Sequence, residues 1–272
     1  MGRRCGVLGD PIEHSLSPVL HTAGYAALGL DWSYAAHRVA SGGLTDFLAS
    51  LDGEWRGLSL TMPLKLEAVP LVDELTERAR LAGAANTIVF DQGRLKGDNT
   101  DIPGAIAAIR ERTSAPLATA VIIGGGATAT SIGLALADLG VRDIEIVVRS
   151  PERGAETCET VHGHPGHPDV TVSRLDEVTA FDVDLVASTI PADAQDAHLV
   201  RACVAVPTIF EIVYHPWPTP LAASIGDRVL VSGFDLLLHQ AAVQFELFTG
   251  EVAPLDAMRA AGEQALAASS GS

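Results

Sequence analysis

The chain has 272 residues, of which 47% are hydrophobic and 19% charged, so it holds enough apolar material for packed cores and is not a disordered chain. Its length predicts two domains. A formal net charge of −16 without a run of Lys or Arg argues against nucleic acid as a partner, and the absence of any run of about 18 apolar residues argues against a membrane span.

The cysteines exclude two further classes of protein. Cys5, Cys158 and Cys203 are odd in number, lie far apart and form no C-x-x-C pair. Neither a disulfide framework nor a zinc site is indicated, and we expect reduced thiols in a cytoplasmic protein.

Short apolar runs alternate with helical stretches in the first part of the chain. Ser17 and Pro18 suit the first positions of a helix, predicted at residues 17–28. Strands are predicted at residues 5–8, 32–39, 57–60 and 85–90. This alternation predicts an α/β domain over residues 1–101.

A second α/β pattern follows a polar stretch. A β-branched run at residues 120–124 indicates a strand buried on both faces. Further strands are predicted at residues 143–148, 184–188, 208–212 and 229–232, and helices at residues 128–139 and 151–161. The alternation is typical of a doubly wound parallel sheet, here over residues 102–232. Residues 233–249 and 254–268 predict two helices, and we expect this last segment, residues 233–272, to pack back on the first domain.

A glycine-rich turn links the first strand of this second domain to the next helix. It matches G-x-G-x-x-[GA] and consists of Gly124, Gly125, Gly126, Ala127, Thr128 and Ala129. Its place between strand and helix favours a Rossmann dinucleotide site over a turn that binds nothing, because the helix N–H groups can receive a pyrophosphate.

The residues after the next strand favour NADP over NAD. An NAD site places an acid there, whereas this chain has Arg149, Ser150 and Arg153. Guanidinium groups match a 2′-phosphate in charge and geometry. The alternative is a solvated helix start that carries two surface arginines.

Small polar residues are dense in the loops of the first domain, at residues 14–18, 59–65, 86–87 and 97–101. A polyhydroxylated substrate needs such hydroxyl, amide and carboxylate partners. Reduction of a ketone also needs a proton donor, for which Lys65 and Asp101 are candidates. For either residue alone, an ordinary surface charge is the alternative.

These motifs, in this order, resemble those of the shikimate dehydrogenase family, which interconverts 3-dehydroshikimate and shikimate with NADP(H) on the route to aromatic amino acids. The resemblance covers nearly the whole chain. Its motifs are G-x-P-I-x-H-S-x-S-P-x-x-H at residues 9–21, T-x-P-x-K at residues 61–65, A-N-T at residues 85–87, G-D-N-T-D at residues 97–101 and a closing G-x-x-M-L-x-x-Q-like segment at residues 233–240.

The resemblance implies a role for each matching residue. It implies that the substrate carboxylate is held by Ser15, Ser17 and Tyr214, and the ring hydroxyls by Thr61, Asn86 and Gln240. It implies that Lys65 and Asp101 are the catalytic acid–base pair. For the cofactor it implies the glycine-rich turn (Gly124, Gly125, Gly126, Ala127 and Thr128), the segment with Arg149, Ser150 and Arg153, and the nicotinamide neighbours Thr189, Ile190 and Gly233.

The implied function is NADPH-dependent reduction of 3-dehydroshikimate by a monomer or homodimer, without a metal. Two rivals remain open: an NAD-dependent quinate or dual quinate/shikimate dehydrogenase, and a non-catalytic dinucleotide-binding regulator. Arg149 and Arg153 speak against NAD, and the intact Lys65 and Asp101 speak against the regulator.

Three departures from the family pattern bear on the site. Ser59 replaces a common Asn, which predicts a shorter or water-mediated contact to the substrate. Val148 replaces the Asn before Arg149, and the Thr189-Ile190-Pro191 segment differs from N-A-T-S-x-G. Separately, the cluster His162, His164 and His167 could bind a metal, but its Gly and Pro neighbours favour a solvated loop.

Overall fold

The computed structural model describes residues 2–270, and these divide into two compact units. The first unit combines the residues up to Thr100 with those from Leu237 onward, and the second is Asp101–Leu236. The chain thus leaves the first unit after Thr100 and returns to it within one long helix, α10 (Gly233–Thr249).

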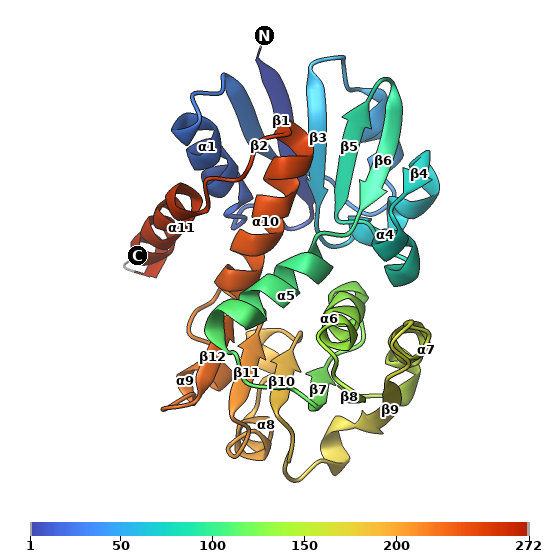
Figure 1. Cartoon of the computed structure of the whole chain (residues 1–272), viewed down its shortest axis with the longest axis vertical. Coiled ribbons are helices and arrows are strands. Elements are labelled where there is room, and N and C mark those ends of the chain that lie inside the picture. The colour runs from blue at the N-terminus through green and yellow to red at the C-terminus, as the bar shows by residue number, and fades with distance from the viewer. Residues whose placement is uncertain (1, 271–272) are drawn as a thin grey trace. The chain divides into compact units, whose positions relative to one another are not determined.

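The first unit is built on a mixed sheet of six strands (Figure 1). Its spatial order is β2-β1-β3-β5-β6-β4. β1 is parallel to β2 and β3, whereas β5 is antiparallel to β3 and β6. The strands are β1 (Arg3–Gly9), β2 (Trp32–Arg38), β3 (Trp55–Leu60), β4 (Glu74–Leu75), β5 (Thr87–Asp91) and β6 (Arg94–Asp98).

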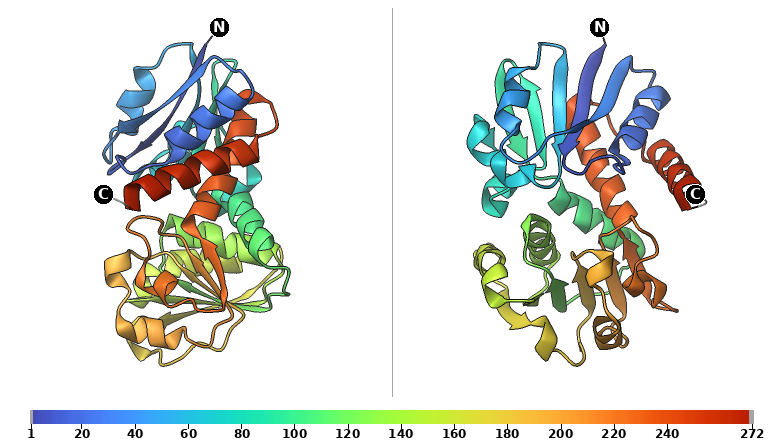
Figure 2. Two further views of the ribbon diagram at one scale, coloured as in Figure 1. Left: turned by 90° about the vertical axis from the view of Figure 1, so that its left-hand side faces the viewer. Right: turned by 180° about the vertical axis from the view of Figure 1, so that it is seen from behind.

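The C-terminal helices pack on this first unit, as predicted. Helix α11 (Leu255–Ser270) contacts α1 (Ser17–Ala27), and the two lie side by side in both views of Figure 2. The Phe245 ring of α10 lies 5.4 Å from that of Tyr25 on α1, centroid to centroid. The short helices of the unit are α2 (Leu44–Ala49), α3 (Leu64–Glu67) and α4 (Glu77–Ala82).

The second unit is an all-parallel sheet of six strands in the order β12-β11-β10-β7-β8-β9. Renumbered within the unit, this is the 3-2-1-4-5-6 order of a dinucleotide-binding fold, with its switch point between β7 and β10, so the predicted doubly wound fold is confirmed. The strands are β7 (Thr119–Ile123), β8 (Asp143–Val148), β9 (Asp169–Arg174), β10 (Leu185–Ser188), β11 (Thr208–Glu211) and β12 (Val229–Ser232).

Helices cover both faces of this second sheet. Figure 1 shows α6 and α7 on one face and α8 and α9 on the other. The central strand β7 is therefore enclosed, and Val121, Ile122 and Ile123 are fully buried. The helices are α5 (Asp101–Arg112), α6 (Ala127–Asp138), α7 (Ala155–His162), α8 (Ala197–Ala202) and α9 (Pro220–Ala223).

Three predicted local structures were wrong. Gly97 and Asp98, expected in a loop, end strand β6, and Asp101 begins helix α5. The edge strand β9 was missed, although its half-exposed residues alternate between polar and apolar as those of a half-buried strand do. The helix predicted at residues 151–161 is broken at Gly154 into a 3-10 turn, Pro151–Arg153, and the helix α7.

The described residues contain no helix that is both long and apolar enough to cross a membrane. All three cysteines, Cys5, Cys158 and Cys203, are free thiols.

Candidate functional site

The polar motifs of the first unit meet at one edge of its sheet. Parallel strands end at the same edge, and an antiparallel neighbour begins there. Ser59 near the end of β3 lies opposite Thr87 at the start of β5, and Thr87 lies opposite Asp98 at the end of β6. The loops that carry the motifs are thereby gathered at this edge.

Backbone hydrogen bonds tie these loops together. The N–H of Thr61 donates to the carbonyl of Leu8 in β1 at 2.9 Å. The N–H of Ala85 donates to the carbonyl of Lys65 in α3, also at 2.9 Å. Thr61 and Lys65 therefore stand between the end of β1 and the segment before β5, and the side chains of both are half-buried.

The two serines predicted to hold a carboxylate lie at the start of α1. The backbone N–H of Ser17 donates to Oγ of Ser15 at 3.4 Å. Ser17 is buried, whereas Ser15 is half-buried. Both hydroxyls thus belong to one turn that follows β1.

Asn86 and Gln240, far apart in the sequence, are brought together. Nδ2 of Asn86 lies 3.4 Å from Oε1 of Gln240 on α10 and 3.0 Å from Oγ1 of Thr100. Oδ1 of Asn86 accepts from the backbone N–H of Thr100 and from the Thr87 hydroxyl, each at 2.8 Å. The amide is therefore held in one orientation.

A residue that sequence reasoning missed anchors the loop before Asp101. The buried Asp98 carboxylate accepts from Nε and Nη2 of Arg78 at 2.7 and 2.6 Å, and from the Thr76 hydroxyl at 2.6 Å. Such a bidentate pair gives geometric specificity as well as energy. Asp101 itself, only 6% exposed, is the first residue of α5 and of the second unit.

The glycine-rich turn of the second unit needs its first two glycines. Gly124 has φ +117°, and an added Cβ would lie 2.1 Å from Oγ1 of Thr189. A Cβ at Gly125 would lie 2.2 Å from the carbonyl O of Arg153. Gly126 faces open space directly before α6, which fits the close approach of a pyrophosphate to the helix N–H groups.

The structure places Arg149 and Arg153 at the carboxyl end of β8, flanking Ser150. Both arginines are exposed, and within residues 2–270 no acidic side chain pairs with either guanidinium. Neither Asp nor Glu occupies the position just after β8. The donor set therefore fits a cofactor that carries a phosphate on its ribose better than one with a free hydroxyl.

Thr189, Tyr214 and Gly233 follow the carboxyl ends of β10, β11 and β12. Thr189 donates through both its N–H and its hydroxyl to the carbonyl of Ile123, at 2.9 and 2.8 Å, which ties it to the end of β7 beside the glycine-rich turn. A Cβ at Gly233 would lie 2.1 Å from the carbonyl O of Ile212, so α10 begins against the segment that leads to Tyr214. Ligands of open parallel sheets bind at these strand ends.

Glu211 is a second residue that sequence reasoning missed. This fully buried carboxyl group at the end of β11 accepts from Nε2 of Gln195 at 2.6 Å, the Thr219 hydroxyl at 3.0 Å and the N–H of Val213 at 3.0 Å. It joins the loop after β10 to the loop that carries Tyr214. A charged residue that ends an apolar strand was the available signal, because a buried carboxyl group needs partners.

The stability contributed by Glu211 should depend on pH. Burial raises the pKa of Glu211, although its hydrogen bonds act in the opposite direction. A folded-state pKa above the unfolded value of about 4.3 favours folding below that value and loses this contribution as pH rises through the folded-state pKa. Urea unfolding across this range should show the wild type losing stability relative to Glu211→Gln as pH rises. The exposed variant Glu156→Gln is the control, and parallel curves for wild type and Glu211→Gln would refute the expectation.

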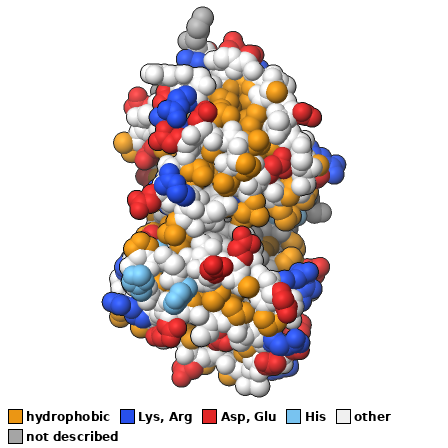
Figure 3. All heavy atoms as spheres, turned by 90° about the vertical axis from the view of Figure 1, so that its right-hand side faces the viewer, with side chains coloured by type: hydrophobic (Ala, Val, Ile, Leu, Met, Phe, Trp, Pro, Cys, Tyr) orange, Lys and Arg blue, Asp and Glu red, His pale blue; other side chains and the backbone are white. Residues whose placement is uncertain are grey.

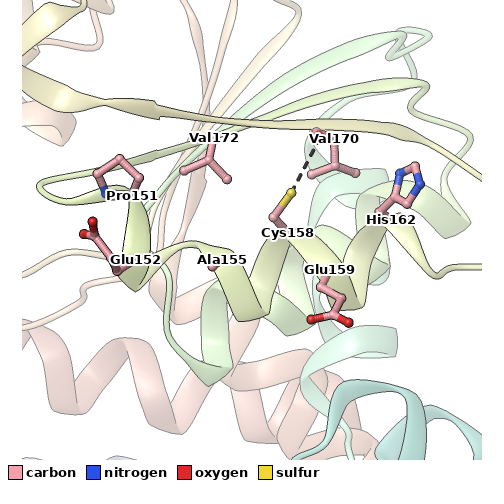
Figure 4. Close-up of a pocket in the computed structure, with 8 residues that line it drawn as sticks. All are labelled: Pro151, Glu152, Ala155, Cys158, Glu159, His162, Val170 and Val172. Atoms are coloured by element: carbon pink, nitrogen blue, oxygen red, sulfur yellow. Dashed lines mark hydrogen bonds between the residues drawn. The ribbon is translucent and has the colours of Figure 1, made fainter.

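A pocket of about 620 Å³ lies between α7 and the edge strand β9 (Figure 4). None of the predicted site residues lines it. The Cys158 thiol within it lies 3.6 Å from the carbonyl O of Val170, and burial raises its pKa, which keeps it protonated. The lining residues are Pro151, Glu152, Ala155, Cys158, Glu159, His162, Val170 and Val172.

The histidine cluster is not the wholly solvated loop that its sequence predicts. His164 is buried, and its Nε2 lies 3.0 Å from Oδ1 of Asp138 while its Nδ1 accepts from the N–H of Gly166 at 2.9 Å. His164 therefore folds the turn after α7 onto α6. Across the described part of the chain, no group of three His, Cys, Asp or Glu side chains is arranged to hold a metal ion.

Ser59 forms two hydrogen bonds inside the first unit. Its hydroxyl is buried, accepts from the Tyr34 hydroxyl at 2.6 Å and donates to Oε1 of Gln244 at 2.7 Å. Its one hydrogen is thus committed inside the protein, and it ties β3 to α10.

One face of the molecule carries scattered charges of both signs (Figure 3). On the face drawn in Figure 3, Lys and Arg side chains lie in small groups among acidic and uncharged ones, without a continuous basic area. The exposed cations of this face are too dispersed to follow a nucleic-acid backbone.

Two family models match the chain. Residues 7–88 match the shikimate dehydrogenase substrate binding domain, and residues 233–261 match the shikimate 5'-dehydrogenase C-terminal domain. The first match lies within the first unit, and the second covers α10 and the start of α11, most of which belong to the same unit.

Individual relatives cover nearly the full length. A shikimate dehydrogenase (NADP(+)) of Desulfitobacterium hafniense is 35% identical over 98% of this chain and 100% of its own length. The crystal structure of Mycobacterium tuberculosis shikimate dehydrogenase matches with a TM-score of 0.88 and 38% identity, over 96% of this chain and 99% of that one. A quinate dehydrogenase from Corynebacterium glutamicum in complex with NAD matches with a TM-score of 0.87 and 26% identity, over 97% and 99%.

Proposed function

This chain belongs to the shikimate dehydrogenase family, and on that premise we propose that it catalyses the reversible, NADP(H)-dependent reduction of 3-dehydroshikimate to shikimate. The observation that carries the proposal is the edge of the first unit's sheet, where Thr61, Lys65 and Asn86 stand on segments joined by backbone hydrogen bonds. A ring with several hydroxyls needs such a set of mixed donors and acceptors.

In the proposed site the substrate is oriented by two groups of side chains. The hydroxyls of Ser15, Ser17 and Tyr214 hold its carboxylate. The side chains of Thr61, Asn86 and Gln240 contact its ring hydroxyls. The pairing of Asn86 with Gln240 supports this division, because one amide group there presents N–H and the other C=O.

Lys65 carries the proton in the proposed reaction. Reduction of the ketone adds a hydride to carbon and a proton to oxygen, and the Lys65 ammonium donates that proton. In the oxidation direction the Lys65 amine accepts the proton of the substrate hydroxyl, and the Asp101 carboxylate orients Lys65. NADPH supplies the hydride when bound.

We assign the cofactor site to the glycine-rich turn, with Gly126, Ala127 and Thr128 at the pyrophosphate, and to Arg149, Ser150 and Arg153 at the 2′-phosphate. Thr189, Ile190 and Gly233 would adjoin the nicotinamide. The two exposed guanidinium groups, which have no acidic partner among residues 2–270, support NADP over NAD.

The second candidate is an NAD-dependent quinate or dual quinate/shikimate dehydrogenase, favoured by the similarity to the quinate dehydrogenase structure. Reduced-nicotinamide absorbance separates the candidates when shikimate or quinate is each paired with NADP or NAD. We expect the highest kcat/KM with shikimate and NADP. Preference for quinate with NAD would favour the second candidate, and no turnover with any pair would leave a non-catalytic regulator.

A further inference from the structure

A continuous chain of buried polar side chains runs through the first unit. It begins at Tyr34 on β2, passes through Ser59 on β3 and Gln244 on α10, and ends at Thr87 and Asn86. All five side chains are less than 9% exposed. Its consecutive hydrogen bonds are Tyr34 to Ser59 at 2.6 Å, Ser59 to Gln244 at 2.7 Å, Gln244 to Thr87 at 2.9 Å and Thr87 to Asn86 at 2.8 Å.

Each of these hydrogen bonds has one donor and one acceptor, and the donors can be followed from Tyr34 to Asn86. Burial raises the pKa of the Tyr34 phenol, which therefore keeps its hydrogen. The phenol donates to Oγ of Ser59 at 2.6 Å. A hydroxyl has one hydrogen, so Ser59 passes its own to Oε1 of Gln244. The Gln244 amide must then present Nε2 to Thr87, and the Thr87 hydroxyl donates to Oδ1 of Asn86.

A separate hydrogen bond shows the orientation of the Asn86 amide at the far end of this network. The backbone N–H of Thr100, which can only donate, also reaches Oδ1 of Asn86, at 2.8 Å. Two donors on one oxygen identify it as the carbonyl of the amide. Nδ2 of Asn86 is left toward Thr100 Oγ1 and toward Oε1 of Gln240, a residue that we also assign to the ring hydroxyls.

We propose that Tyr34, Ser59 and Gln244 are positioning residues that act together with the Thr100 N–H to hold Asn86 as a hydrogen-bond donor to a ring hydroxyl of the substrate. This inference rests on the proposed function. Within this hydrogen-bond network, Ser59 acts on the substrate only through Gln244, Thr87 and Asn86. Removal of its hydroxyl takes the Ser59 partner away from the buried Tyr34 phenol and from the Gln244 carbonyl. The Gln244 amide is then held only at its other end, where Nε2 donates to Thr87 and to the backbone carbonyl of Asn86.

The test compares Ser59→Ala and Tyr34→Phe with the wild type in shikimate oxidation. We expect each variant to raise KM for shikimate about 10-fold while KM for NADP stays unchanged, because the loss of a positioned hydrogen-bond donor has an effect of this order. Ser59→Thr keeps the hydroxyl and should restore the wild-type KM. Ser33→Ala, an exposed neighbour on β2, is the matched control.

A double-mutant cycle distinguishes positioning from general damage. In an Asn86→Ala background, Ser59→Ala should raise KM for shikimate no further. Tyr34→Phe keeps the ring that stacks on His21, with centroids 4.2 Å apart, so it carries the test if Ser59→Ala fails to fold.

Each outcome has a distinct meaning. Wild-type turnover of shikimate with KM unchanged in both variants would overturn the inference alone, as would additive effects with Asn86→Ala. An absence of shikimate turnover by the wild type would overturn the proposed function and, with it, the inference.

Discussion

Replacement of Lys65 by methionine should lower kcat for shikimate oxidation by a factor of about 10² to 10⁴, the usual contribution of a positioned acid–base group. Methionine keeps an unbranched side chain of similar length on α3 but carries no transferable proton. KM for NADP should stay near the wild-type value, because Lys65 is assigned to the proton step and not to cofactor binding. Initial rates at saturating shikimate and NADP measure the effect.

Lys96→Met is the matched control for this substitution. Lys96 lies on β6 of the same unit and pairs with Asp91 at 2.8 Å. It has no part in the proposed proton transfer. Asp101→Asn should lower kcat in the same direction as Lys65→Met, and the double variant should be little worse than Lys65→Met alone, because the two residues are proposed to act as one unit. A Lys65→Met enzyme with kcat within a few-fold of the wild type would refute its role as proton donor.

Replacement of Arg149 or Arg153 by alanine should raise KM for NADP by about 10- to 100-fold, since hydrogen bonds to charged groups contribute about 1.5–3 kcal/mol. KM for shikimate and the kinetics with NAD should change little, because neither shikimate nor NAD carries the 2′-phosphate. The double variant should show the larger shift in the ratio of kcat/KM for NADP to that for NAD.

Arg142→Ala controls for the loss of a positive charge. Arg142 is exposed and immediately precedes β8, at the end of the strand opposite to Arg149. If Arg142→Ala and Arg149→Ala raised KM for NADP equally, the effect of Arg149 would come from the overall electrostatic field of the protein and not from a contact with the 2′-phosphate. Equal increases of KM for NADP and NAD would also contradict the proposed role.

The second unit was predictable from local patterns. A strand buried on both faces, a glycine-rich turn and a helix follow one another within residues 119–138, so the signal lies in neighbouring residues. Strand β9 escaped prediction because an edge strand is half-exposed and lacks the continuous apolar run of a central strand.

Residue types at the candidate site were also visible in the sequence. Lys65, Asn86 and Gln240 were named from their motifs, and the structure places Asn86 beside Gln240. The roles of Ser59, Asp98 and Glu211 were not visible. Each of these side chains bonds to at least one partner distant in the chain, as Ser59 does to Gln244, which is 185 residues away.

The sequence by itself determined the two α/β patterns, the dinucleotide turn with its arginines, and the polar groups available for a polyhydroxylated substrate. All of these are encoded by adjacent residues or by fixed short spacings. Only the tertiary structure decided which way each buried amide and hydroxyl points and which carboxyl groups have shifted pKa values. Those properties depend on desolvation and on the hydrogen-bond partners that folding brings from elsewhere in the chain.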